Sequence, residues 1–297
     1  MVCACCASIP YVSMRLFATA LATIYGHRML IPSSFKKLRR WTFIASVLAS
    51  LTLSASAIFL CVLSWNPELR ARTAATLISL GHKEATPLDV HRCAVVEQGR
   101  VEGRVLEFGP GPGSNFKCFS PGQGRASNST ASPGGSIERY TGVDPNGHFR
   151  EMLRNEKERA NLTFSVDLVG AKGEEWALPP ADQGSYDVVL ATHVLCSVSS
   201  PDIVLRNAVR ALKPGGRYIF FEHVAAEDGS LISYYQRFVA GVLHILADGC
   251  QFGDTEKVLK DAFSEDQFDL EITRFEAPVP KFLAFIRPHI MGVATKK

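Results

Sequence analysis

Three glycines at alternate positions follow a short apolar run and could bring backbone groups close to a ligand. Residues 105–108 are apolar except for Glu107. They are followed by Gly109, Gly111 and Gly113. An apolar run that ends in glycine predicts a buried strand that turns sharply into a loop. Because glycine has no Cβ atom, the N–H groups of this loop can approach a ligand closely. The stretch is therefore a candidate nucleotide-binding loop.

A carboxylate follows the next apolar run of the chain. The run at residues 140–143 is followed directly by Asp144 and then by Pro145. In a doubly wound sheet, a carboxylate after the second strand holds the ribose hydroxyl pair of a nucleotide. Asp144 is therefore the predicted ribose ligand.

Two histidines could take up a proton near such a ligand. His193 follows an apolar run that ends at Thr192, and His223 follows Glu222 at the end of a later run. Ligands of open α/β sheets bind beyond the carboxyl ends of the strands, which is where both histidines are expected. Each has an ordinary interpretation as well, because His193 could be a simple loop residue and His223 could tie down the loop after its strand.

The elements that must position these residues alternate along the chain. Residues 185–190 are a predicted strand with Asp187 near its start, and residues 202–212 have the apolar spacing of a helix. The helix stops at Pro214-Gly215-Gly216, and a further apolar run follows. Alternating strands and helices predict an α/β fold with a parallel sheet.

These landmarks, in this order, resemble the class I S-adenosylmethionine-dependent methyltransferases. A closer resemblance is to the membrane-bound alkyl thiol S-methyltransferases of the methyltransferase-like seven family, and it covers about residues 100–297. It is carried by segments that read NFK at 115–117, VLCSV at 194–198, FEHVAAE at 221–227, DGC at 248–250 and RPHI at 287–290. The resemblance implies a Rossmann-like seven-stranded mixed sheet with helices on both faces, closed by an antiparallel strand pair.

The resemblance also implies S-adenosylmethionine as cofactor. Glu174 stands where these enzymes present an acid to the exocyclic amine of adenine, and Trp176 could cover the ring. An exposed Glu174 and a core Trp176 are equally good interpretations. The implied cofactor residues are Glu107, Gly109, Gly111, Gly113, Asp144, Pro145, Glu174, Trp176 and Thr192.

Methyl transfer from a sulfonium is an in-line displacement, so most of the acceleration can come from positioning and from excluding water. A thiol, with a pKa near 8.5, needs only modest help to become a thiolate, whereas a phenol needs more. His193 and His223 are the candidate catalytic bases. The resemblance also implies that the aromatic-rich helix expected over residues 231–247 lies over an acceptor pocket.

Charge and cysteine content exclude other classes. The formal net charge is +3, but residues 1–67 hold six basic residues and no acidic one, which leaves the rest of the chain mildly acidic. A nucleic-acid partner is therefore not expected. The eight cysteines lack C-x-x-C or Cys/His ligand spacing, so the sequence predicts neither a disulfide scaffold nor a metal site.

The N-terminal part of the chain predicts a membrane anchor. Residues 1–40 are basic and acid-free, as in an organellar targeting segment, and residues 41–65 carry no charge and are long enough for one transmembrane helix. Residues 66–100 are an expected helical connector, and the methyltransferase domain spans residues 101–297. Within it, residues 120–136 are rich in Ser, Gly and Pro and predict a disordered insertion.

Flanking charge gives an orientation. The basic residues before the apolar segment predict that the N-terminus stays on the cytosolic or matrix side, with the domain across the membrane. That arrangement favours the mitochondrial inner membrane. The endoplasmic reticulum is the alternative, with a shallow hairpin over residues 9–31 and 41–65 that keeps the domain in the cytosol.

The sequence thus predicts a membrane-anchored enzyme that methylates a small lipophilic acceptor, with a thiol implied by the resemblance. One alternative is a quinone precursor or another phenol as acceptor. Another is a catalytically silent fold that acts as an assembly factor, suggested by Pro110 and Pro112 where the family tends to have Cys and Thr. An NAD-linked dehydrogenase is disfavoured, because the loop lacks the final G-x-x-G spacing.

Overall fold

The computed structural model describes residues 33–82, 86–119 and 137–297. Most of the predicted targeting segment and the whole predicted insertion at 120–136 lie outside these residues. The chain divides into two compact units, Met1–Leu69 and Arg70–Lys297.

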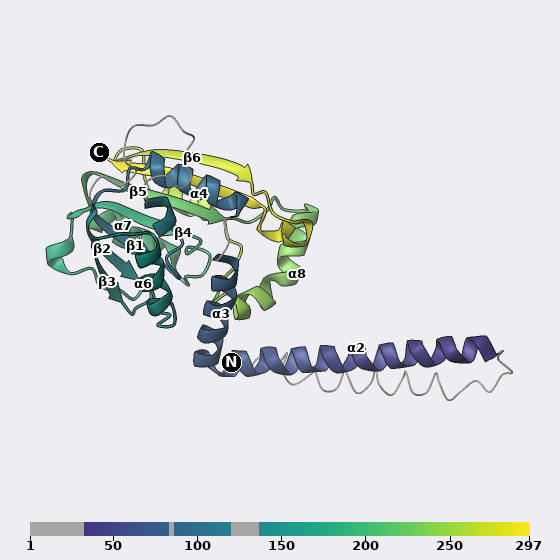
Figure 1. Ribbon diagram of the computed structural model, residues 1–297. Coiled ribbons are helices and arrows are strands. Elements are labelled where there is room, and N and C mark those ends of the chain that lie inside the picture. The colour runs from purple at the N-terminus through teal and green to yellow at the C-terminus, as the bar shows by residue number, and fades with distance from the viewer. Residues whose placement is uncertain (1–32, 83–85, 120–136) are drawn as a thin grey trace. The chain divides into compact units, whose positions relative to one another are not determined.

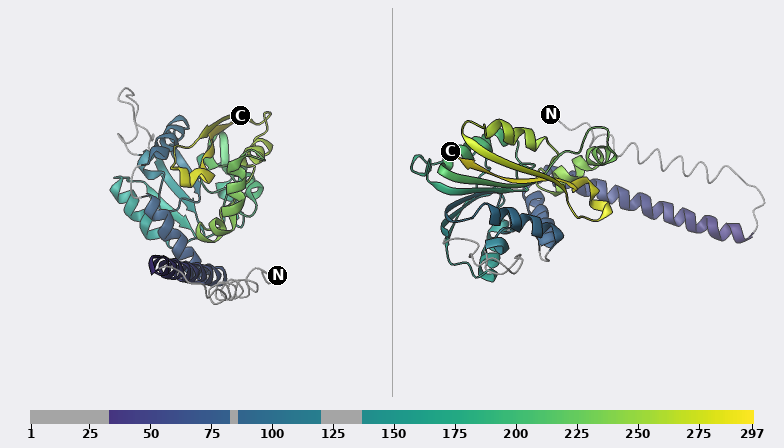
Figure 2. Two further views of the ribbon diagram at one scale, coloured as in Figure 1. Left: turned by 90° about the vertical axis from the view of Figure 1, so that its right-hand side faces the viewer. Right: turned by 90° about the horizontal axis from the view of Figure 1, so that it is seen from above.

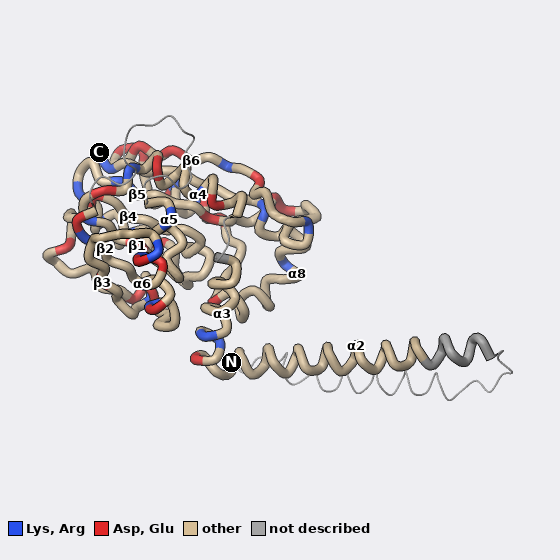
Figure 3. The backbone as a smooth tube through the Cα atoms, in the orientation of Figure 1, with Lys and Arg blue, Asp and Glu red and all other residues tan. Residues whose placement is uncertain are grey.

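The first unit is dominated by one long helix, α2 (Ser33–Trp65). Its segment Trp41–Trp65 has 25 residues with a mean hydropathy of 2.2, and by length and composition it is a candidate membrane span. No charged residue interrupts this segment (Figure 3). Hydroxyl groups within it bond back to the helix, with Thr52 Oγ1 donating to Ala49 O at 2.8 Å and Ser64 Oγ to Leu60 O at 2.8 Å. Such bonds satisfy polar atoms that lipid would leave without partners.

The second unit contains a seven-stranded mixed sheet, which confirms the predicted fold class (Figure 1). Its strand order is β3-β2-β1-β4-β5-β7-β6. The strands are parallel except β7, which runs antiparallel to both β5 and β6. Their bounds are β1 Gly103–Phe108, β2 Ile137–Val143, β3 Ser165–Val169, β4 Tyr186–Thr192, β5 Leu212–His223, β6 Phe268–Glu276 and β7 Pro288–Lys296.

Helices lie on both faces of this sheet, as Figures 1 and 2 show. Because side chains alternate along a strand, Leu106 and Phe108 of β1 enter one apolar core and Val105 enters the other. The first core also contains residues of α7 and α9, and the second contains residues of α4, α5 and α6. The helices are α3 Pro67–His82, α4 Pro87–Gln98, α5 Phe116–Phe119, α6 Phe149–Arg159, α7 Pro201–Ala211, α8 Leu231–Leu246 and α9 Thr255–Ala262, with short 3₁₀ helices η1 Pro180–Asp182 and η2 Lys281–Ile286.

A disulfide joins two helices on the second face. Cys93 of α4 is bonded to Cys118 of α5, 25 residues later in the chain. No sequence spacing predicted this bond, because it depends on α4 lying against α5. It anchors the short helix that follows the glycine loop.

The register of the central strands decides which loops meet. Phe108 of β1 pairs with Ala191 of β4, and Thr192 of β4 pairs with Phe221 of β5. These three strands are parallel, so the loops that begin at Gly109 and His193 and the end of β5 at His223 share one edge of the sheet.

Gly292 of β7 gives a test of this packing. A Cβ atom there would overlap the Glu271 carbonyl oxygen and lie 2.6 Å from Phe220 Cζ. We expect Gly292→Ala to destabilise the chain by about 1–3 kcal/mol, the usual cost of overpacking. The matched control is Gly241→Ala in α8, where a Cβ atom would meet nothing within 4 Å and which should stabilise by about 0.5–1 kcal/mol. Urea unfolding of the full chain in detergent measures both changes, and equal midpoints for the two variants would contradict the packing described.

Candidate cofactor and acceptor site

The glycine loop has the backbone conformation that its sequence predicted. Gly109, Gly111 and Gly113 have φ values of 60°, 53° and 91°, a region that favours glycine. A methyl group at Gly109 would collide with Val194 of the loop after β4. A methyl group at Gly111 would instead meet no heavy atom within 4 Å. The loop is therefore packed closely at its start and open at its centre.

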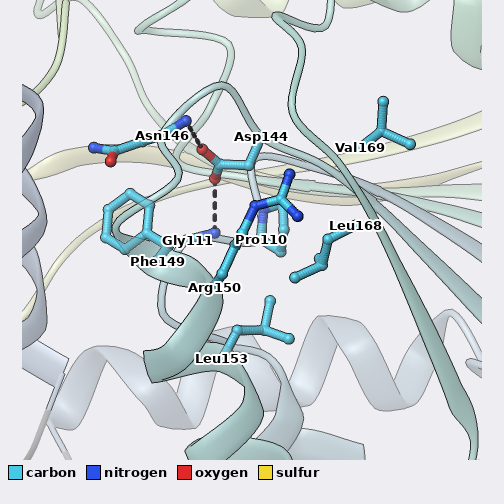
Figure 4. A pocket seen from close by; sticks show the side chains of 9 residues that line it. All are labelled: Pro110, Gly111, Asp144, Asn146, Phe149, Arg150, Leu153, Leu168 and Val169. Carbon is cyan, nitrogen blue, oxygen red and sulfur yellow. Dashed lines mark hydrogen bonds between the residues drawn. The ribbon is translucent and has the colours of Figure 1, made fainter.

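Asp144 is fixed against the centre of that loop (Figure 4). Its Oδ2 accepts from the N–H of Gly111 at 3.0 Å, and its Oδ1 accepts from the N–H of Asn146 at 2.8 Å. Burial raises the pKa of Asp144 to about 6, although these two N–H donors oppose the rise. Pro145, between the two bonded residues, is exposed.

A pocket opens beside Asp144, between the glycine loop and α6 (Figure 4). Its polar groups come from the loop backbone and from Asp144, Asn146 and Arg150, and the remaining wall is apolar. The lining residues are Pro110, Gly111, Asp144, Asn146, Phe149, Arg150, Leu153, Leu168 and Val169. A carboxylate with free lone pairs at the mouth of an apolar pocket suits a nucleoside.

Glu107 lies beneath the glycine loop in a buried network. It accepts from Tyr140 Oη at 2.6 Å and from Asn115 Nδ2 at 2.7 Å. Burial raises the pKa of Glu107 to about 7, and the bonds from Tyr140 and Asn115 oppose the rise. Asn115 Nδ2 also lies 3.0 Å from Thr192 Oγ1, which links the ends of β1 and β4.

Asn115 is a candidate cofactor residue that the sequence did not predict. Its Oδ1 is buried and has no partner among the residues that the structure describes. An unpaired buried carbonyl costs about 1–3 kcal/mol, so this atom suits a donor on a ligand. The only earlier signal was its place in the NFK segment of the resemblance.

Glu174 and Trp176 have different surroundings. Glu174 Oε1 accepts from the N–H of Ser199 at 3.0 Å, and its Oε2 is buried without a partner among the described residues. Trp176 lies in the first apolar core, edge-on to Phe108 with ring centroids 5.8 Å apart. Trp176 thus has the core position that its alternative interpretation expected, and the adenine contacts of both residues stay predictions.

His193 is enclosed by other side chains. It has a positive φ of 55°, and its N–H donates to Phe221 O at 2.8 Å. Its Nε2 lies 3.0 Å from His289 Nε2, and its Nδ1 lies 3.3 Å from an Arg92 Nη2. Burial, followed by Arg92 and the neighbouring histidines, lowers the pKa of His193 well below its usual value. Because both ring nitrogens are engaged, this geometry does not favour His193 as the base at the acceptor.

His223 belongs to a buried cluster with two thiols, which we call the thiol–imidazole cluster: Cys196, His223 and Cys250. The three possible ligand atoms all lie within 4.8 Å of one another, and His223 Nε2 is 3.2 Å from Cys250 Sγ. A hydrogen bond with Cys250, and then the charge of His223, lower the pKa of Cys196 well below its usual value although burial opposes them. Cys196, His223 and Cys250 are each separated by 27 residues in the sequence, so no short metal-binding motif indicated the cluster.

Glu222 connects the two parts of the site. Its Oε1 accepts from the N–H groups of Val194 and Leu195 at 3.0 and 3.2 Å. Burial raises the pKa of Glu222 well above its usual value. The Glu222 side chain therefore positions the loop after β4. In that loop, Val194 packs against the glycine loop and Cys196 belongs to the cluster.

Comparisons with known proteins agree with this geometry. A family described as "Methyltransferase domain" matches residues 106–220. The chain is 36% identical over 195 residues to thiol S-methyltransferase TMT1A of Homo sapiens, a match that covers 65% of this chain and 70% of that protein. It is 35% identical over 196 residues to TMT1B of Rattus norvegicus, covering 66% and 71%. The crystal structure of the protein BH2331 of Bacillus halodurans C-125 superposes with a TM-score of 0.50 at 15% identity, over 70% of this chain and 98% of that one, which concerns the fold alone.

Asp144 gives a test of the cofactor half of the site. Hydrogen bonds to a charged group contribute about 1.5–3 kcal/mol, so Asp144→Asn should weaken S-adenosylmethionine binding by about tenfold to a hundredfold at pH 8. In the unchanged chain, affinity should also fall as pH drops below about 6, because protonation of Asp144 removes an acceptor. This slope should be smaller in the variant, in which Glu107, with a pKa of about 7, still titrates in the same range.

Calorimetric titration of the full chain with S-adenosylmethionine between about pH 8 and pH 5 measures both effects. Glu151→Ala, at an exposed position of α6, is the control and should bind normally. Unchanged affinity in Asp144→Asn would remove Asp144 from the cofactor site.

Proposed function

The chain belongs to the family of S-adenosylmethionine-dependent methyltransferases that includes the thiol S-methyltransferases, and we propose that it methylates a small lipophilic thiol at a membrane. The reaction class follows from this membership. The thiol acceptor is supported above all by the identity to TMT1A, which extends over 195 residues.

The cofactor fits the residues around the glycine loop. The Asp144 carboxylate has lone pairs that can accept from the ribose hydroxyls, and Asn115 Oδ1 has no hydrogen-bond donor among the described residues. No heavy atom lies within 4 Å of the position that a Cβ atom would take at Gly111, so a ligand can approach the loop there. When bound, S-adenosylmethionine supplies a methyl group on a sulfonium that one displacement can transfer. The residues of the chain hold the two reactants in line and exclude water.

The acceptor half of the site is assigned to His223 rather than to His193. His193 uses both ring nitrogens in contacts with Arg92 and His289, whereas His223 Nδ1 has no partner among the described residues. A thiol needs little proton transfer to become reactive, so a single polar group near its sulfur suffices.

A lipophilic acceptor is supported by α8. Its Gln236 Nε2 donates to Val224 O and Phe285 O at 3.0 and 2.8 Å, which fixes the helix next to the end of β5. On its outer side, Leu231 and Phe238 are 88% and 84% exposed. An exposed apolar helix face suits contact with a membrane, from which apolar molecules could enter.

Membrane anchoring is assigned to α2. Its segment of 25 uncharged residues would span about 37 Å as a helix, against a hydrocarbon core of about 30 Å. The disulfide between Cys93 and Cys118 favours a compartment in which disulfides persist. This agrees with the orientation that places the domain across the membrane from the basic flank, and the mitochondrial inner membrane stays a prediction.

Label transfer tests the reaction. The full chain in detergent is given methyl-labelled S-adenosylmethionine with a simple alkyl thiol, and separately with an alcohol and a phenol of similar size. We expect a labelled thioether and little labelled ether, because only the thiol ionises readily near neutral pH. Asp144→Asn, measured at the same cofactor concentration, should give less product. Labelled phenol ether alone would move the acceptor to the phenol class, and cofactor binding without any transfer would favour the silent assembly factor.

Lysine substitution tests the anchor. Leu51→Lys with Ala55→Lys places two charges near the centre of the apolar segment, each costing about 2.5–3.5 kcal/mol in a bilayer. We expect the unchanged chain to resist alkaline carbonate extraction and this variant to be extracted. Thr42→Lys with Ser64→Lys is the matched control, because lysines near the ends of a span can reach the interface. Extraction of the unchanged chain would contradict a transmembrane α2.

A further inference from the structure

We propose that the thiol–imidazole cluster is a three-ligand zinc site whose open fourth position binds the acceptor sulfur as a thiolate. The ligands are Cys196 Sγ, His223 Nε2 and Cys250 Sγ. The role at the acceptor rests on the proposed function, whereas metal binding itself does not.

The spacing of the three atoms suits tetrahedral zinc. Zn–S bonds of about 2.3 Å and Zn–N bonds of about 2.0–2.1 Å place neighbouring ligand atoms roughly 3.5–3.8 Å apart. All three atoms of the cluster lie within 4.8 Å of one another, with His223 Nε2 3.2 Å from Cys250 Sγ. Adjustments of the side chains alone are therefore enough to enclose an ion.

Backbone contacts hold the three ligands from separate elements. Gln251, next to Cys250, donates its N–H to Cys196 O at 2.8 Å, which ties the segment after α8 to the loop after β4. Gly249 has a φ of 96°, and a Cβ atom on it would come within 3.0 Å of Ser197 O. His223 is held in β5 by its pairing with His289 of β7. A site whose ligands are fixed by the surrounding structure binds metal with little ordering cost.

Charge also favours an ion in this place. Cys196, His223 and Cys250 are 8%, 7% and 7% exposed, so a thiolate in the cluster is largely out of water. An isolated buried negative charge is costly. A divalent cation with two thiolates and a neutral imidazole has no net charge, which removes that cost. Buried thiols alone are common, because cysteine often serves as a small apolar side chain. Two buried thiols together with a buried imidazole, however, form the kind of sulfur and nitrogen ligand set that zinc prefers.

The cluster is close to the cofactor loop through a short piece of chain. Val194 contacts the position of Gly109, and Cys196 is two residues further along the same loop. Thr192, at the start of the loop, contacts Asn115. The loop after β4 therefore contributes both to the packing of the glycine loop and to the cluster.

Zinc coordination would supply the thiolate without a strong base. The acceptor R–SH binds at the fourth position and releases its proton to solvent, because coordination to a cation lowers the pKa of a thiol. A sulfur lone pair of the thiolate forms the new S–CH₃ bond while the bond between that methyl and the cofactor sulfonium breaks. The products are R–S–CH₃, S-adenosylhomocysteine and the released proton, and zinc is neither oxidised nor reduced.

Cobalt titration tests the metal site directly. The full chain in detergent, treated with chelator under reducing conditions, is titrated with Co²⁺ alone and then with Zn²⁺. We expect equimolar Co²⁺ binding with a thiolate-to-cobalt charge-transfer absorption that Zn²⁺ displaces. Cys196→Ser, Cys250→Ser and His223→Asn should each weaken binding by more than about a hundredfold, beyond the effect of losing an outer-shell partner. Cys61→Ser, in α2, should keep the absorption.

The outcomes separate this inference from the proposed function. Cofactor binding, measured in the same samples, shows that each variant is folded. No charge-transfer absorption in folded chain, or its persistence in the three ligand variants, would overturn the site. Full thiol methylation by metal-free chain would overturn the role at the acceptor. Equimolar metal binding without thiol methylation would support the site and remove the thiol from the proposed function.

Discussion

The buried carboxyl group of Glu222 is the contact on which both halves of the site depend. Two N–H groups of the loop after β4 donate to one of its oxygens. That loop begins at Thr192 beside the Glu107 network, packs Val194 against Gly109 and carries Cys196 into the cluster. Burial raises the pKa of Glu222 well above its usual value, so the group can stay protonated and avoid the cost of a buried charge.

The two halves use different chemical groups. In the cofactor half, hydrogen bonds set the backbone of the glycine loop and the positions of two carboxyl groups, Glu107 and Asp144. The acceptor half is made of side chains from three elements that lie far apart in the sequence. Backbone sites tolerate change in neighbouring side chains, whereas a side-chain site depends on each residue. This difference explains why cofactor motifs are easier to recognise than acceptor pockets.

The sequence predicted those features that depend on local patterns. The apolar run before Gly109, the acid after β2 and the alternation of strands and helices are local, and the structure has the expected mixed sheet. Features that depend on register and packing were missed or left open. His193 contacts Arg92 and His289, and the segment after α8, which carries Cys250, is hydrogen-bonded to the loop that carries Cys196. The residues in each contact are far apart in the sequence, so no short motif marks them.

The central chemical question is how the acceptor loses its proton. Among the residues that the structure describes, His223 contacts the thiol of Cys250, and no hydrogen bond joins it to a carboxylate. A cation held by the same three side chains removes the need for a base, because the thiol ionises on binding and its proton leaves to solvent. The arrangement then needs only an open position beside the glycine loop and an apolar path to it.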